Sequence, residues 1–232
     1  MPSQPATALG GAPAQERALR PQGRKTMQRL LDAGRTVFES QGFHAARVDD
    51  IVKTAKTSHG TFYLYFANKE DLFTALAYDA MAQMEMLGAS LGPITPDEVG
   101  RNALRTWVAD FVDIYAAHGT VIRAWTDREF ASRDLGQRAQ ASLMALSGAL
   151  SRRIDEARKV GATSAEIEGV ACLSMLERFN YFQQSHQIDF DHDAAIDVLT
   201  RAVFEGFFMP SKPSPAVRRA RIRRGAGSST PA

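Results

Sequence analysis

A short segment near the N-terminus gathers hydroxyl, aromatic and basic side chains of the kinds that bind nucleic acid. The groups that could contact a base or a phosphate are Ser58, His59, Thr61, Tyr63, Tyr65 and Lys69. In a helix, Phe62 and Phe66 share one face because they are four residues apart, and they can anchor that face inward. Thr61, Tyr63 and Tyr65 then point toward solvent or a duplex. The segment therefore predicts a helix that presents polar and aromatic groups to DNA.

Three short helices are predicted to position these side chains. The spacing of apolar residues indicates helices over about residues 24–41, 48–55 and 58–66, with a tight turn before the third. Gly42 tolerates the left-handed conformation that often ends a helix, and Ser58 is a good N-cap. Two helices joined by a tight turn are typical of a helix-turn-helix, whose second helix enters a major groove.

A fourth helix is predicted over about residues 69–91, with Asn68 as its N-cap. Lys69 lies in its first turn, where free backbone N–H groups and the positive end of the helix dipole favour a phosphate. The lysine adds a positive charge at that point. This helix would link the first three helices to the rest of the chain.

The net charge of +2 is divided unevenly along the sequence. Residues 24–69 carry eight Lys and Arg against four Asp and Glu, whereas residues 70–210 carry twelve against twenty-one. Residues 211–232 carry six basic residues and no acidic one. A small basic part joined to a large acidic body indicates that one end of the molecule meets a polyanion.

The whole sequence predicts an all-α protein with two domains. Helical spacing and helix stop signals continue to about residue 210, with no convincing strand. We expect a helix-turn-helix DNA-binding domain over residues 24–72 and a larger helical domain over residues 73–210. Residues 1–23 and 211–232 hold few large apolar side chains, which predicts a disordered tail at each end, the second of them basic.

Composition excludes several classes of protein. Cys172 is the one cysteine in 232 residues, which excludes an intramolecular disulfide and a Cys-based zinc cage. The five histidines show no metal-ligand spacing, so we expect no metal and no cofactor. No stretch approaches the roughly 18 consecutive apolar residues of a membrane span, and the start lacks the apolar core of a signal peptide. A cytoplasmic protein is expected.

Three motifs in the first 72 residues resemble the tetracycline-repressor (TetR) family. They are Gly42-Phe43, Val48 to Ile51 and, above all, Gly60 to Leu72 with the sequence GTFYLYFANKEDL. The resemblance covers roughly residues 24–72, and beyond it the chain matches in length and helicity. It implies that Thr61, Tyr63, Tyr65 and Lys69 fall on family positions that contact DNA. By the same resemblance, Thr61 and Lys69 contact phosphates and Tyr63 points toward bases.

The resemblance also implies a homodimer on a palindromic operator. A symmetric DNA-binding dimer of this type binds two half-sites about 34 to 36 Å apart. We expect the last two helices, over about residues 164–185 and 191–209, to form the dimer interface. A small, largely apolar effector that enters the larger domain would release the operator, which predicts a repressor.

Ala46, Arg47 and Lys56 depart from the family pattern, and the role of His59 beside them stays open. Ala46 and Arg47 stand where Thr or Ser usually precedes the second helix, and a lost cap costs about 0.5 to 2 kcal/mol. Arg47 then serves a phosphate, or the start of the helix is frayed. Lys56 replaces a common turn glycine, at a cost on the order of 1 kcal/mol if its φ is positive. His59 contacts a base or the DNA backbone, or it is an exposed histidine without a role.

Aromatic and methionine side chains recur at helical spacing in the acidic body. They are Trp107, Phe111, Tyr115, Trp125, Met144, Met175, Phe179 and Phe182. As a group they could line a pocket for a large apolar effector. For any single residue among them, ordinary core packing is the alternative.

Two other functions stay open at this point. A DNA-binding regulator could respond to a protein partner instead of a small molecule. An all-helical enzyme could use Ser90, in a G-x-S-x-G pattern that has no strand leading into it, or Glu177 with His186. The arginine run over residues 218–224 adds nonspecific DNA affinity or only solubilises the tail.

Overall fold

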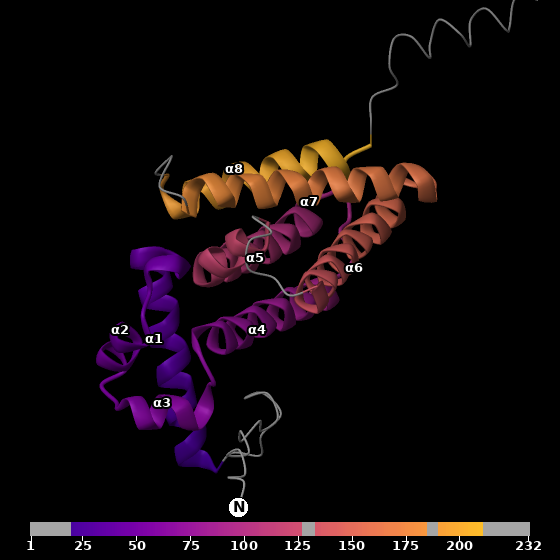
Figure 1. Ribbon diagram of the computed structural model, residues 1–232. Helices are drawn as coiled ribbons and strands as arrows, with labels where there is room; N and C mark the ends of the chain where they lie inside the picture. Colours follow the sequence, from indigo (N-terminus) through magenta and orange to yellow (C-terminus); the bar gives the residue numbers. More distant parts are fainter. Residues whose placement is uncertain (1–19, 127–132, 185–189, 211–232) are drawn as a thin grey trace, which may run out of the picture.

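The computed structural model describes residues 20–126, 133–184 and 190–210, and within these ranges the chain forms helices and no strand. The elements are α1 (Pro21–Ala45), α2 (Val48–Thr54), α3 (His59–Tyr65), α4 (Lys69–Ser90), α5 (Glu98–Thr126), α6 (Arg133–Arg158), α7 (Ala162–Gln184), α8 (His192–Val203) and the π-helical segment η2 (Phe204–Phe208). The all-α prediction is confirmed, with three N-terminal helices followed by a larger helical body (Figure 1).

The two predicted tails lie almost entirely outside the described residues. The exception is the end of the first one, because α1 begins at Pro21 and not near Arg24. Proline is favoured in the first turn of a helix, where its missing N–H removes no hydrogen bond. The arginine run over residues 218–224 and His186 also fall outside the described ranges.

The N-terminal helices and the start of α4 pack around one apolar core, to which α5 and α6 also contribute side chains. Phe38 from α1, Ile51 from α2 and Phe62 from α3 are all fully buried in it. Removal of such side chains from water is the main favourable term in folding, so the core fixes the orientation of α3 against α1. The outer face of α3 is therefore presented on a rigid support.

Local capping signals set the ends of these helices. Gly42 has a φ of 77° and interrupts the helical backbone near the end of α1. Ser58 Oγ accepts a hydrogen bond from the backbone N–H of Thr61 at 3.1 Å, and Asn68 Oδ1 accepts one from that of Asp71 at 2.8 Å. Both predicted N-caps are confirmed.

Helix α5 is the centre of the larger body. It packs against α4, α7 and α8, while α6 packs against α4 and α7 (Figure 1). Its stripe of Trp107, Phe111 and Tyr115 is buried in the main apolar core. Cys172 from α7 lies in the same core, where burial raises the pKa of its thiol to about 12. The cysteine is therefore a packing residue in a neutral form.

In the sequence, His118 and Gly119 form a helix stop signal that predicts a break at this point, and that prediction is wrong. The helix continues without interruption to Thr126. Both residues are buried, so tertiary packing holds the backbone helical at a glycine that would be a stop signal in an exposed helix.

Helix α4 belongs to both cores. Leu72 and Leu76 are buried with the N-terminal helices, whereas Met84 and Leu87 are buried with the larger body. The two domains are thus joined by one continuous helix, and a movement of α4 in the body is a movement of the support on which α3 rests.

Candidate nucleic-acid interface and ligand pocket

The turn between α2 and α3 contains a residue in the left-handed backbone conformation, which the glycine common at this position in the family adopts readily. Lys56 has a φ of 51°, so the expected strain at this position is present. The turn closes through a hydrogen bond from the backbone N–H of Thr57 to the carbonyl of Val52 at 2.9 Å. The geometry of a helix-turn-helix is therefore kept despite the lysine.

The spacing of the aromatic residues predicted the buried face of α3 correctly, whereas Tyr65 is not turned fully to solvent as expected. Phe62 and Phe66 are buried, and their rings lie 5.7 Å apart between centroids. Tyr63 is 57% exposed and points away from the core. Thr61 and Tyr65 are half-buried, and Tyr65 packs partly against the N-terminal core, so Tyr63 is the most available aromatic group.

Polar side chains at the start of α3 are held by short-range bonds. The hydroxyls of Ser58 and Thr61 lie 3.0 Å apart, and Ser58 also caps the helix. His59 Nε2 lies 3.1 Å from Asp49 Oδ1, which ties α3 to α2 at the surface. This contact gives His59 a partner within the protein that the sequence pattern did not suggest.

Arg47 stands at the N-cap position of α2 without a capping bond from its side chain. This matches the expectation that the usual cap is missing. Its side chain is exposed at the end of a helix that carries Asp49 and Asp50 in its first turn. An exposed guanidinium at this point is free to turn toward a phosphate.

Lys69 has protein partners at the end of α1. Its Nζ donates to the carbonyls of Phe43 at 2.9 Å, His44 at 3.0 Å and Ala46 at 3.0 Å, and it lies 4.8 Å from the ring centre of Phe43. An ammonium group has three N–H donors, so these bonds occupy all of them. The lysine caps the end of α1, where a positive charge is favoured by the helix dipole. Its predicted phosphate contact stays a prediction.

The predicted aromatic pocket residues separate into core and surface. Trp107, Phe111 and Tyr115 are buried, and Met175 and Phe179 pack against the same core. Trp107 donates from Nε1 to the carbonyl of Leu87 at 2.9 Å, which fixes its ring between α5 and α4. By contrast, Met144 and Phe182 are exposed, on α6 and α7 respectively. The side chain of Trp125 lies outside the part of the chain that the structure describes.

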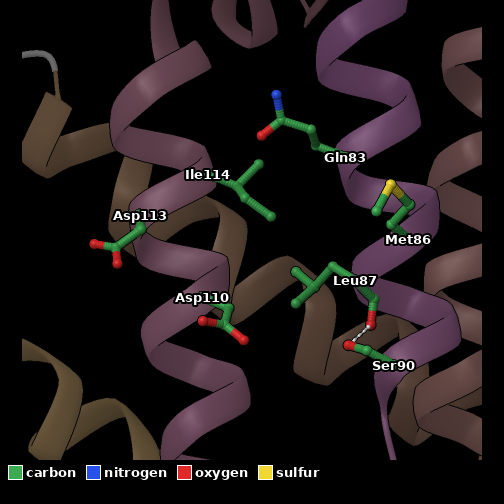
Figure 2. A pocket seen from close by; sticks show the side chains of 7 residues that line it. All are labelled: Gln83, Met86, Leu87, Ser90, Asp110, Asp113 and Ile114. Atoms are coloured by element: carbon green, nitrogen blue, oxygen red, sulfur yellow. Dashed lines mark hydrogen bonds between the residues drawn. The ribbon is translucent and has the colours of Figure 1, made fainter.

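A groove between α4 and α5 was missed by the sequence analysis. It is open to solvent, has a volume of about 340 Å³ and is lined by Gln83, Met86, Leu87, Ser90, Asp110, Asp113 and Ile114. Figure 2 shows Asp110, Asp113 and Ile114 on α5 facing the α4 residues, with the Asp113 carboxylate turned away from α4. No single periodicity could have revealed the site, because it arises where two helices meet. The Ser90 hydroxyl donates to the carbonyl of Leu87 at 2.9 Å (Figure 2).

One carboxylate oxygen connects this groove to the N-terminal domain. Gln83 Nε2 donates to Asp79 Oδ2 at 3.3 Å, and the same oxygen lies 3.5 Å from the Arg35 guanidinium of α1. His118 Nε2 of α5 lies 3.9 Å from it. Burial and the charge of Arg35 lower the pKa of His118, and Asp79 opposes them. Helices α1, α4 and α5 therefore meet at a charged cluster.

Two further observations concern the described residues as a set. No group of three or more His, Cys, Asp or Glu side chains among them is arranged to hold a metal ion. In the same part of the chain, every helix is too short or too polar to cross a bilayer.

Comparison with known proteins identifies the N-terminal domain. Residues 30–76 match the family described as bacterial regulatory proteins, tetR family. The chain is 38% identical over 73 residues to the HTH-type regulator YdgC of Bacillus subtilis, covering 32% of this chain and 37% of the relative. It is 26% identical over 118 residues to the HTH-type transcriptional repressor SCO4008 of Streptomyces coelicolor, covering 50% and 56%. The match thus spans between about a third and just over half of these relatives' length.

The fold extends beyond the matched segment. The crystal structure of the regulator FadR from Bacillus subtilis in complex with stearoyl-CoA superposes with a TM-score of 0.58 at 19% identity, covering 77% of this chain and 98% of that one. At this identity the likeness shows the fold. The relatives are transcriptional regulators and not enzymes, so the enzyme hypothesis for Ser90, Glu177 and His186 has no support from them. In its helix-turn-helix segment, the chain is similar to the tetR family of bacterial regulatory proteins.

Proposed function

We propose that the protein is a homodimeric DNA-binding transcriptional repressor that a small ligand releases from a palindromic operator. The main observation behind this proposal is the exposed outer face of α3. Tyr63 is exposed there on a helix that Phe62 and Phe66 anchor in the core. A rigid helix of this size fits the major groove, where Tyr63 can contact base edges.

The side chains around Tyr63 suit the flanking phosphates. Arg47, Ser58 and His59 are exposed near the ends of α2 and α3, and Thr61 is half-buried beside them. Contacts to phosphates fix the register of a protein on DNA, while base contacts carry sequence information. Lys69 supports this surface from behind, because its bonds hold the end of α1 against the start of α4. Because the operator belongs to the chromosome, we place the protein in the cytoplasm.

Exposed apolar residues on the last two helices support the proposed dimer. Ile167 and Val170 on α7 are 67% and 46% exposed, and Val198 on α8 is 48% exposed. Helices α7 and α8 run together along one edge of the molecule, away from α3 (Figure 1). An apolar face of this kind is typical of a surface that a second copy covers.

A ligand-binding role for the larger body is supported by the neighbour of the same fold, since FadR from Bacillus subtilis was solved with stearoyl-CoA. The ligand must bind the released form more tightly than the DNA-bound form, because only that difference in affinity shifts the equilibrium.

Selection of bound genomic fragments, followed by affinity measurements on the enriched site, tests the proposal. We expect an inverted repeat, and we expect Tyr63→Ala to weaken binding at least about fivefold, since a base contact is worth roughly 1–3 kcal/mol. Val99→Ala is the control, because Val99 is exposed on α5 far from α3. Sedimentation of the free protein should give a dimer.

Two results would contradict the proposal. One is the absence of any enriched inverted repeat at low ionic strength. The other is a Tyr63→Ala variant that binds the selected site as tightly as the parent, which would remove α3 as the recognition helix.

A further inference from the structure

The groove between α4 and α5 combines an apolar wall with negative charge. Met86 and Leu87 from α4 and Ile114 from α5 form the wall, and Asp110 and Asp113 lie on the α5 side (Figure 2). No lysine or arginine is among the residues that line it. A volume of about 340 Å³ is in the range of small-molecule sites.

The two carboxylates differ in their surroundings. Asp113 Oδ1 lies 3.3 Å from His192 Nε2 of α8. Among the residues that the structure describes, Asp110 has no ion-pair partner, although it lines the same groove. An anionic ligand would lie beside Asp110 without a neighbouring lysine or arginine, whereas a ligand with a positive charge next to an apolar body would suit both Asp110 and the apolar wall.

We propose that this groove is the effector site and that it takes an amphipathic cation, with an apolar body against Met86, Leu87 and Ile114 and its positive charge at Asp110. The inference rests on the function proposed above, because it names the class of ligand that releases the operator.

One oxygen atom, Asp79 Oδ2, connects the groove to helix α1 of the N-terminal domain. Gln83 lines the groove and donates to Asp79 Oδ2, and that oxygen also faces Arg35 of α1. A ligand that moves Gln83 changes how strongly Asp79 holds Arg35. Because α1 carries the support of α3, occupancy of the groove shifts the recognition helix. Asp79 is therefore a positioning residue, and it does not line the groove itself.

Titration calorimetry with three decyl compounds tests the ligand class. The probes are decyltrimethylammonium, decanesulfonate and decanol, each used below the concentration at which micelles form. We expect the cation to bind at least about tenfold more tightly than the other two. Asp110→Asn should weaken cation binding about fivefold, while Asp193→Asn, an exposed carboxylate on α8 outside the groove, should leave it unchanged. Equal binding of the three probes, or an unchanged affinity in Asp110→Asn, overturns the inference.

The coupling is tested with the selected operator. Decyltrimethylammonium should raise the operator Kd of the parent at least fivefold. In Asp79→Asn the cation should still bind within twofold of the parent, while the operator Kd changes less than twofold on its addition. Gln83→Met, which keeps the charge on Asp79, should show the same loss of response, and thermal unfolding confirms that both variants are folded.

The outcomes separate the two proposals. Normal operator binding without cation binding overturns the inference and leaves the regulator intact. Cation binding with full response in both variants overturns the role of Asp79. Failure of the parent to bind any operator overturns the proposed function, even if the groove binds the cation.

Discussion

At the scale of single residues, Lys69 shows how a charged side chain can hold one helix against the end of another. Its three hydrogen bonds reach carbonyls that lie 23 to 26 residues away in sequence. Local sequence carries no signal for partners at that distance, so the pattern around Asn68 and Lys69 predicted only a phosphate site. The capping of α1 emerges from the packing of α4 against it.

We expect Lys69→Met to lower the free energy of unfolding by about 1.5–3 kcal/mol, because bonds from a charged group are worth that much and the carbonyls lose their partner. Lys53→Met is the control, since Lys53 is exposed in the last turn of α2. Urea unfolding measures both. If the two variants are equally stable, the capping role of Lys69 is wrong.

His118 makes stability depend on pH. It is 1% exposed, and burial followed by the charge of Arg35 lowers its pKa below the usual 6.5, with Asp79 acting in the opposite sense. Below pH 6.5 the unfolded chain therefore binds a proton that the folded chain does not. The free energy of unfolding should fall as pH drops through 6.5 toward the lower folded pKa, by up to about 1.4 kcal/mol per pH unit.

Urea unfolding of the parent and His118→Gln between pH 7.5 and pH 5.5 measures this effect. The variant should lose the part of the slope that the parent shows in this window. His192→Gln, which changes an exposed histidine, should keep it. Identical slopes in the parent and His118→Gln would show that another group titrates.

At the scale of elements, the contact between α6 and α7 depends on a small residue. A Cβ added at Gly169 would meet Ser151 Oγ and lie 2.8 Å from the backbone carbonyl oxygen of Ser147. Gly169 lies on α7, whereas Gly148 lies on α6 and has nothing within 4 Å of such an atom. One glycine permits a close approach of two helices, and the other only weakens its helix.

Gly169→Ala should therefore destabilise the protein by about 1–3 kcal/mol, since the backbone of α6 must move. Gly148→Ala should be neutral or stabilise it by up to about 1 kcal/mol through helix propensity. Thermal or urea unfolding of the two variants makes the comparison. A stabilising effect in both would mean that α6 and α7 are separated more easily than their contact suggests.

Elements set by local signals were the ones that sequence could predict. The N-caps at Ser58 and Asn68 and the buried pair Phe62 and Phe66 follow from residues within one turn of each other. At the start of α5, Thr95 and Asp97 both carry side-chain oxygens that could cap the helix, and in the structure Asp97 accepts from the N–H of Gly100 at 2.9 Å. Which of the two oxygens caps α5 depends on the path of the chain that leads into the helix.

The site in the larger body was beyond sequence analysis for a different reason. Trp107, Phe111 and Tyr115 have the same helical spacing whether they line a pocket or fill a core, and in the structure they fill the core. The groove uses Asp110 and Ile114 from between them, on the edge of α5 that faces α4. Only the relative rotation of the two helices decides which edge is open.

At the scale of the whole molecule, charge and function divide in the same way. The basic N-terminal part carries the proposed contacts to a polyanion, and the acidic body carries the proposed cation site. The body therefore repels DNA except through the domain that binds it, which favours an orientation with α3 foremost. Opposite charges in the two parts keep the two ligands apart.

The composition of the N-terminal core limits how the protein can be divided for engineering. The N-terminal core contains Val121 of α5 together with Leu135 and Ala139 of α6, in addition to residues from α1 to α4. A hybrid regulator spliced at residue 72 would set these three side chains against a foreign surface. Transplanting the DNA-binding head to another sensor would require the matching ends of two body helices to travel with it.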